Sequence, residues 1–188
     1  MGSGVVIHAA VEGIVDEAVV RRLIAHVGGI AGDVYGKQGK GQLRKRINGY
    51  NKAAQYGPWI VLVDLDHEED CAPPLRRAWI DDPAPSLCFR VAVREVEAWL
   101  LADAERLAAF LGTARSKIPA QPETLDDPKS VIVNLARASR RRDIREDIVP
   151  RGDSGREVGR AYGSRMIEFA SRHWRPEVAA NRADSLRR

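Results

Sequence analysis

The 188-residue sequence is poor in cysteine and contains no long apolar segment. Its two cysteines, Cys71 and Cys88, form no CxxC pair, which argues against a disulfide framework and against a four-cysteine zinc site. The apolar run at residues 5–11 is interrupted by His8 and is far shorter than the ~20 residues that span a membrane. No basic segment of the kind that opens a signal peptide precedes this run. These absences predict a cytoplasmic protein without a membrane span.

Acidic residues are locally absent as well. Residues 34–63 include no aspartate or glutamate but six basic residues: Lys37, Lys40, Arg44, Lys45, Arg46 and Lys52. Residues 137–188 hold 14 arginines against 8 acidic residues, a net charge of +6, which leaves −2 for the other 136 residues of a chain whose total is +4. The composition, 44% hydrophobic and 30% charged, is otherwise that of a globular protein with one domain and a small appendage.

Apolar periodicity predicts alternating strands and helices in the first part of the chain. Apolar runs predict strands at residues 5–11, 30–35, 59–64 and 86–93. Helical spacing predicts helices at residues 16–27, 43–54 and 75–80, and one long helix over residues 96–111. This order favours an α/β domain over about residues 1–112, with a four-stranded, mainly parallel sheet flanked by helices.

Residues 113–188 are expected to form a helical, arginine-rich extension that packs on this domain. Three prolines within residues 113–128 predict a connecting segment. The Asp127-Pro128 pair predicts the start of a helix over residues 129–138, because aspartate is a favoured cap and proline a favoured first helical residue. Another helix is expected over about residues 159–173.

Acidic residues follow three of the predicted strands. Glu12 follows the first strand, Asp64 and Asp66 follow the third, and Glu95 and Glu97 follow the fourth. Because the carboxyl ends of parallel strands lie at one edge of a sheet, where ligands bind, these carboxylates should converge. Asp64 and Asp66 would project to the same side of an extended chain. Oxygen donors of this kind suit Mg²⁺, which keeps waters that a phosphate can replace.

Each acid also has an ordinary structural explanation. Glu12 could be a solvated loop residue, and Asp64 and Asp66 could be turn or capping residues. Glu95 and Glu97 could interact with the dipole of the following helix, and for Glu95 this is the favoured explanation. The expected convergence of acids from separate strands favours a site over three unrelated caps.

The basic segment would lie beside this acidic edge. Lys37, Lys40 and Arg44 could hold a phosphate backbone against the repulsion of the carboxylates, or they could form a solvated helix face. Lys129 is a further candidate for a phosphate contact, with a solvated first-turn lysine as the alternative. The glycines of residues 36–41 do not form a nucleotide P-loop, because the GxxxxGK[ST] pattern fails there.

Two motifs, taken in this order, resemble the TOPRIM domain, a metal-binding module of topoisomerases, bacterial primases and the nucleases of the overcoming-lysogenisation-defect class. The first, VVIHAAVEGIVDEAVV, is an apolar strand followed by Glu-Gly and an acid that opens a helix. The second, WIVLVDLD, is a strand that ends in DxD. A later segment, REVEAWLLAD, is similar to one in small RloB-like TOPRIM proteins, where Glu97 gives the best match.

The resemblance covers about residues 4–112 and implies a Rossmannoid fold with phosphodiester chemistry on DNA or RNA. It implies that Asp64 and Asp66 bind Mg²⁺ or Mn²⁺ and that Glu12 is a metal ligand or a general acid/base. It implies that Glu97 completes a metal site. A setting in phage defence or DNA repair, together with a partner ATPase, is a further expectation. The arginine-rich C-terminal region matches no general TOPRIM motif.

The main hypothesis from the sequence is therefore a metal-dependent nuclease. One alternative is a catalytically silent module that binds nucleic acid or a partner ATPase. A phosphatase of the haloacid-dehalogenase kind is disfavoured, because its DxD motif normally follows the first strand, and the first strand here is followed by Glu-Gly.

Overall fold

The computed structural model describes residues 4–188, which form two compact units. We call residues 4–93 the sheet unit and Arg94–Arg188 the helical unit. The boundary lies at Val93, earlier than the residue 112 expected from the sequence. It lies there because the helix that follows, α4 (Val96–Ala102), is buried along its whole length and packs on helices of the second unit.

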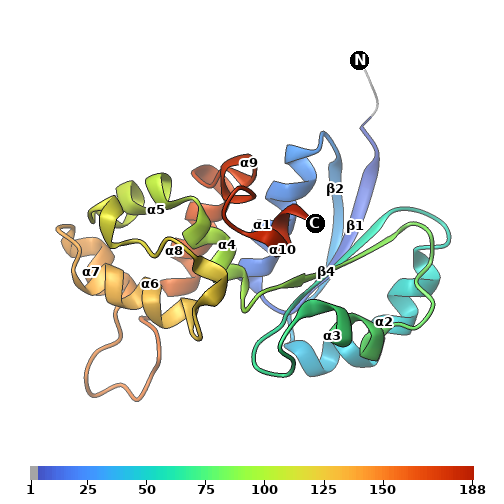
Figure 1. Ribbon diagram of the computed structural model, residues 1–188, viewed down its shortest axis with the longest axis horizontal. Coiled ribbons are helices and arrows are strands. Elements are labelled where there is room, and N and C mark those ends of the chain that lie inside the picture. The colour runs from blue at the N-terminus through green and yellow to red at the C-terminus, as the bar shows by residue number, and fades with distance from the viewer. Residues whose placement is uncertain (1–3) are drawn as a thin grey trace. The chain divides into compact units, whose positions relative to one another are not determined.

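The sheet unit is built on four parallel strands, which confirms the expected fold class (Figure 1). The strands are β1 (Val6–Val11), β2 (Ile30–Gly36), β3 (Trp59–Asp64) and β4 (Leu87–Ala92). Their spatial order is β2-β1-β3-β4, so β1 and β3 are central and the chain reverses its direction of travel across the sheet after β2. Ligands of open parallel sheets bind where such a reversal occurs.

Three helices cover the two faces of this sheet (Figure 1). Right-handed crossovers place α1 (Ile14–His26) on one face, and α2 (Lys40–Ala53) and α3 (Ala72–Trp79) on the other. Apolar side chains spaced three or four residues apart on α2 and α3 pack on the strands in one buried cluster. Its members include Leu43, Ile47, Leu75, Trp79, Val61, Val63 and Phe89. Both helices are thereby fixed to the sheet by burial of one apolar face.

The parallel register aligns the carboxyl ends of the strands. Val11 of β1 pairs with Gly36 of β2, and Asp64 of β3 pairs with Ala92 of β4. The residues that come next in the chain therefore leave the sheet at one edge. This edge holds the acids that the sequence singled out after the first and third strands.

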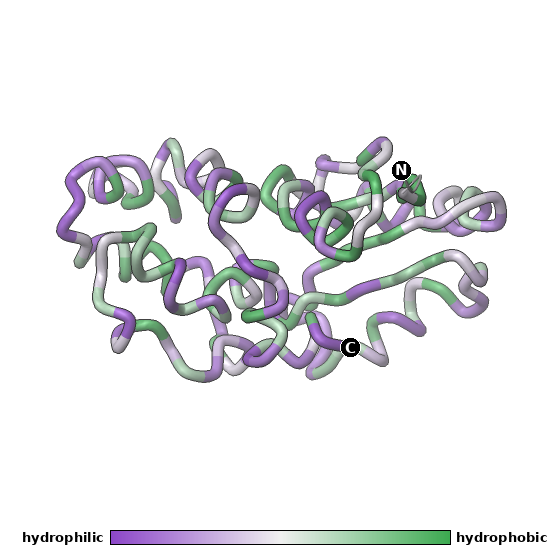
Figure 2. The backbone as a smooth tube through the Cα atoms, turned by 90° about the horizontal axis from the view of Figure 1, so that it is seen from above, coloured by the Kyte–Doolittle hydropathy of each residue, from purple (hydrophilic) through white to green (hydrophobic). Residues whose placement is uncertain are grey.

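The helical unit contains short helices only. They are α4, α5 (Ala104–Leu111), α6 (Pro128–Arg137), α7 (Arg142–Ile148), α8 (Tyr162–Arg172), α9 (Pro176–Ala179) and α10 (Asp184–Arg187), with single 3₁₀ turns at Arg115–Lys117 and Pro122–Thr124. In Figure 2, hydrophobic and hydrophilic stretches alternate along this part of the chain, as expected for helices with one buried face. None of the helices in residues 4–188 is both long and apolar enough to cross a membrane.

The prediction of one long helix over residues 96–111 is wrong, because the chain breaks at Asp103. This residue has φ −86° and ψ 68°, and its carboxylate accepts a hydrogen bond from the Arg106 N–H at 3.4 Å. The fully buried carboxylate also accepts two bonds from the Arg175 guanidinium, at 2.7 and 3.0 Å. Apolar periodicity continues through the break, so the sequence gives no sign that an arginine 72 residues away completes the cap.

Two tryptophans hold the end of the chain to α4. Trp99 and Trp174 are fully buried, and the Trp174 indole N–H donates to the Trp99 carbonyl at 3.0 Å. The Trp99 indole N–H donates to the Ser185 hydroxyl at 2.8 Å. The expected helices at residues 129–138 and 159–173 correspond to α6 and α8, whereas no helix was expected at the position of α7.

Candidate functional site at the carboxyl edge of the sheet

Glu12 lies at the end of β1 and joins it to the end of β3. Its Oε1 accepts a hydrogen bond from the backbone N–H of Asp64 at 2.8 Å. Its Oε2 accepts no hydrogen bond from any residue that the structure describes. Burial raises the pKa of Glu12 from 4.5 to about 7, and the Asp64 N–H and the charge of Lys40 offset only part of that effect. A carboxyl group with this pKa exchanges protons readily near neutral pH.

Lys40 lies among the acids, although the sequence suggested it only as a contact to a phosphate backbone. Its Nζ is 2.6 Å from the carbonyl oxygen of Asp64 and 2.8 Å from Oδ2 of Asp66. It also forms an ion pair with Glu68 at 3.1 Å, and the Lys40 side chain is only 15% exposed. Burial alone would lower the pKa of Lys40, but its bonds to Asp66 and Glu68 outweigh burial and raise it. The ammonium is therefore a fixed positive charge at this edge.

The backbone around the acids adopts rare conformations. Asp66 (φ 51°) and Lys37 (φ 65°) are the two non-glycine residues with positive φ among residues 4–188. Such conformations cost about 1 kcal/mol or more and tend to persist at functional sites. The chain is therefore not extended at Asp66, and the expectation that Asp64 and Asp66 project to the same side of an extended chain is wrong in its premise.

Gly36 allows β2 to end close to β1. Its φ is 89°, and a Cβ atom there would lie 2.1 Å from the carbonyl oxygen of Val11. That carbonyl instead accepts the N–H of Lys37 at 2.9 Å, and the carbonyl of Glu12 accepts the N–H of Gly39 at 3.0 Å. These bonds place the start of α2, and with it Lys40, beside Glu12.

Asp16 fixes the turn that follows Glu12. Its buried carboxylate accepts the N–H of Gly13 at 2.6 Å, which closes the first turn of α1. Its negative charge contributes to the raised pKa of Glu12.

Two of the basic candidates have other partners. The ammonium of Lys37 forms an ion pair with Glu17 at 3.0 Å. Arg44, on α2, places its guanidinium carbon 5.8 Å from the ring centre of Trp79.

The structure thus brings Glu12, Asp66 and the backbone of Asp64 together with Lys40, whereas the candidates Glu97 and Lys129 belong to the helical unit. Glu97 is only 3% exposed and accepts a hydrogen bond from the Tyr162 hydroxyl at 3.1 Å. Burial and the charge of Glu97 raise the pKa of Tyr162 well above its usual range. Lys129 forms an ion pair with Glu95 at 2.9 Å.

The donor set at the edge has the chemistry of a hard-cation site. The carboxylates of Glu12 and Asp66 and the backbone carbonyl of Asp64 are oxygen donors of the kind that Mg²⁺ and Mn²⁺ prefer, and the ammonium of Lys40 already contacts two of them. Within residues 4–188, however, no three His, Cys, Asp or Glu side chains are arranged as a ready group that could hold a metal ion. The ammonium of Lys40 offsets part of the negative charge in this arrangement. Sequence reasoning gave no sign of that role, because Lys40 is 24 residues from Asp64 in the chain.

Comparison with family models, with curated proteins and with solved structures finds no match to this chain.

Proposed function

We propose that the protein is a metal-dependent phosphodiesterase of the TOPRIM kind that cleaves nucleic acid. One observation carries the proposal: acids from two strand ends and the cationic Lys40 converge at the edge where parallel sheets bind ligands. The Glu-Gly and DxD motifs lie at the ends of β1 and β3, in the order that the resemblance requires. A cytoplasmic location and a partner ATPase belong to the same proposal.

Each residue of the cluster has a role in this proposal. Asp64, Asp66 and Glu12 would hold Mg²⁺ or Mn²⁺, which when bound supplies Lewis-acid polarisation of the phosphate and a more acidic water. Alternatively, if Glu12 does not bind the cation, it accepts and returns a proton at Oε2, the oxygen that does not bond to Asp64. With a divalent cation held by Asp66, the ammonium of Lys40 would be available to a phosphate oxygen.

A second function is supported by the same ion pairs. Lys40 already forms ion pairs with both Asp66 and Glu68, so part of the negative charge at this edge is compensated without a metal. This favours a silent module that binds nucleic acid through its basic residues alone. Such a module would bind in EDTA, with an affinity that falls steeply with salt because counterions are released on binding.

Cleavage of end-labelled DNA and RNA, single- and double-stranded, separates the two functions. A phosphodiesterase yields products with Mg²⁺ or Mn²⁺ and none in EDTA. Salt-sensitive binding that is unchanged by metal, with no product from any substrate, would overturn the enzymatic proposal in favour of the silent module.

Replacement of Lys40 by alanine should have opposite effects on stability and on metal binding. Without metal, Asp66, Glu68 and the Asp64 carbonyl lose a charged donor, and the free energy of unfolding should fall by about 1–3 kcal/mol. The affinity for Mn²⁺ should rise, because the ammonium no longer competes for Asp66. Urea unfolding and an Mn²⁺ titration measure the two effects.

The matched control is Lys45→Ala on the same helix, because Lys45 is exposed. This variant should change neither stability nor Mn²⁺ affinity noticeably. A Lys40→Ala protein that is as stable as the Lys45→Ala protein, or that binds Mn²⁺ more weakly than wild type, would contradict the role given to Lys40.

A further inference from the structure

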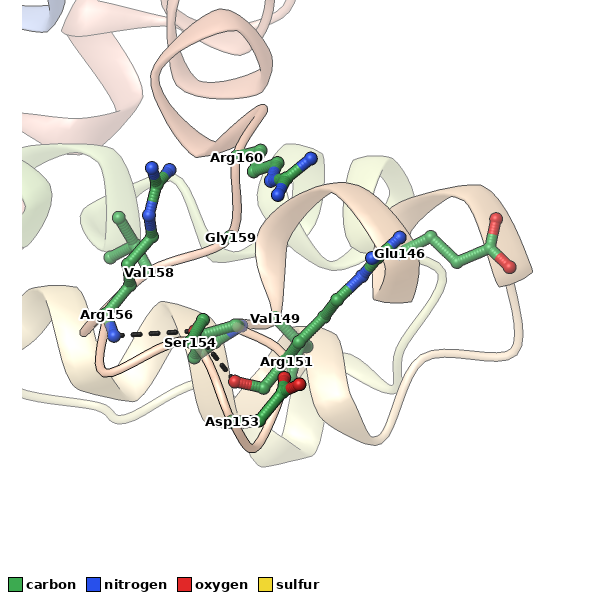
Figure 3. Close-up of a pocket in the computed structure, with 10 residues that line it drawn as sticks. Glu146, Val149, Arg151, Asp153, Ser154, Arg156, Val158, Gly159 and Arg160 are labelled. Carbon is green, nitrogen blue, oxygen red and sulfur yellow. Dashed lines mark hydrogen bonds between the residues drawn. The ribbon is translucent and has the colours of Figure 1, made fainter.

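A loop of the helical unit carries a second concentration of positive charge. The loop connects α7 to α8 and borders a pocket of about 390 Å³ (Figure 3). That volume lies within the roughly 300–1,000 Å³ of small-ligand sites. Three arginines line the pocket, namely Arg151, Arg156 and Arg160. We call residues 149–160 the arginine loop. An adjoining hollow of about 670 Å³ shares Arg151 and Arg160 with this pocket and adds Arg137 and Arg145.

The three guanidinium groups of the arginine loop are not neutralised by the protein. None of them forms a hydrogen bond or an ion pair with any residue among 4–188. Other arginines of the same unit behave differently. Arg165, for example, is 2.7 Å from Asp147, and Arg175 is 2.7 Å from Asp103. Among residues 4–188, unpaired arginines also occur elsewhere in this unit, for example Arg106 and Arg172, but the arginine loop places three of them around one pocket.

The acids near the pocket do not change this balance. Glu146 lines the pocket but pairs with Arg142 at 2.7 Å, and Figure 3 shows its carboxylate directed away from the loop. Asp153 is the remaining acid of the lining. Glu157, the other acid of the arginine loop, does not line the pocket, and three unpaired guanidinium groups against these two carboxylates still leave an excess of positive charge. In Figure 3 Arg151 and Arg160 extend their guanidinium groups toward the same side of the loop.

The backbone of the loop is held in a defined conformation. At its base the N–H of Gly159 donates to the Ile148 carbonyl at 2.8 Å, and the N–H of Ala161 donates to the Asp147 carbonyl at 3.1 Å. A Cβ at position 159 would lie 2.3 Å from that Asp147 oxygen, so this approach requires glycine. Within the loop, Ser154 Oγ donates to the Arg151 carbonyl at 2.7 Å. A positively charged loop that is ordered before binding loses less entropy when a ligand binds.

We propose that the arginine loop is a binding site for the phosphate groups of a nucleic-acid strand. Guanidinium groups form two parallel bonds to a phosphate, and unpaired ones release condensed counterions from the strand when they bind. The inference rests on the proposed function for the identity of the ligand, because the nuclease needs a surface that holds the strand. The loop lies outside the residues that the TOPRIM resemblance covers.

Binding of a fluorescently labelled oligonucleotide in EDTA tests the loop separately from catalysis. For the Arg151→Gln, Arg160→Gln double variant, the dissociation constant should rise about tenfold or more. The slope of log affinity against log salt should become shallower by about 1.5, close to the value for two lost phosphate contacts. Inorganic phosphate should weaken binding by wild type more than an equal ionic strength of chloride does, and this difference should shrink in the variant.

Two comparisons make the result specific. Arg106 and Arg172 are exposed arginines of the same unit outside the pocket, and their double Gln variant should change the slope by less than half as much. The Arg151→Lys, Arg160→Lys variant should keep most of the slope but lose affinity, because lysine lacks the planar fork. Equal effects of the two Gln pairs, or none from either, would overturn the site. If wild type binds the oligonucleotide and the variants change binding as predicted, but wild type cleaves no substrate, the catalytic proposal is contradicted and the loop remains supported.

Discussion

Replacing Asp64 and Asp66 together by asparagine should reduce metal-dependent cleavage about 1,000-fold or more. Asparagine preserves the size of both side chains but removes the two negative charges that the proposal assigns to the cation. A bound cation is worth several kcal/mol of transition-state stabilisation, and each 1.4 kcal/mol corresponds to a tenfold change in rate. Single-turnover cleavage at saturating protein measures the effect without contributions from product release.

The matched control replaces Asp81 and Asp82, two exposed acids that follow α3 in the same unit. The Asp81→Asn, Asp82→Asn protein carries the same change of net charge and should cleave as wild type does. A thermal melt of each variant shows that the fold is retained. Cleavage that survives in the Asp64→Asn, Asp66→Asn protein would remove these residues from the catalytic site.

Glu12→Gln should abolish a loss of stability that the metal-free protein undergoes as the pH rises. The pKa of Glu12 is raised from 4.5 to about 7 in the folded protein. Below the lower value both states are protonated; between the two values the unfolded chain releases a proton that the folded chain keeps. The free energy of unfolding therefore falls with rising pH over this window, by up to about 3 kcal/mol in total. Glutamine stays neutral and still offers an acceptor to the Asp64 N–H.

Urea unfolding in EDTA at pH 5, 6, 7 and 8 measures this effect, and the relevant quantity is the difference between variant and wild type at each pH. The variant should gain stability relative to wild type from pH 5 to pH 8, and it should lose cleavage activity. Glu157→Gln, at an exposed position of the arginine loop, controls for the loss of one carboxylate and should follow wild type. A difference that does not change with pH would contradict the raised pKa.

The sheet was predictable from the sequence because its signals are local. The strand at residues 59–64 matches β3 at both ends, since a continuous apolar run followed by aspartate has few other stable conformations in a parallel sheet. The meeting of Glu12 with the end of β3 follows from the strand order, which short crossovers and their handedness largely determine.

What the sequence did not reveal depends on contacts between distant residues. The break at Asp103 requires Arg175, and the charge balance at the acids requires Lys40. Neither pair shares a spacing that a helix or a strand would produce. The arginine loop was visible as composition only, because whether an arginine is neutralised depends on which acids fold beside it.

The most direct test of the proposed function is a titration of Mn²⁺ into the purified protein, with free metal followed by electron paramagnetic resonance. The proposal predicts that wild type and the Asp81→Asn, Asp82→Asn control bind Mn²⁺ with equal affinity, and that binding is lost in the Asp64→Asn, Asp66→Asn protein. The titration extends to ~10 mM, because sites completed by substrate phosphates bind metal weakly alone. No binding by wild type over that range, or equal binding by all three proteins, would contradict a metal site at the carboxyl edge of the sheet.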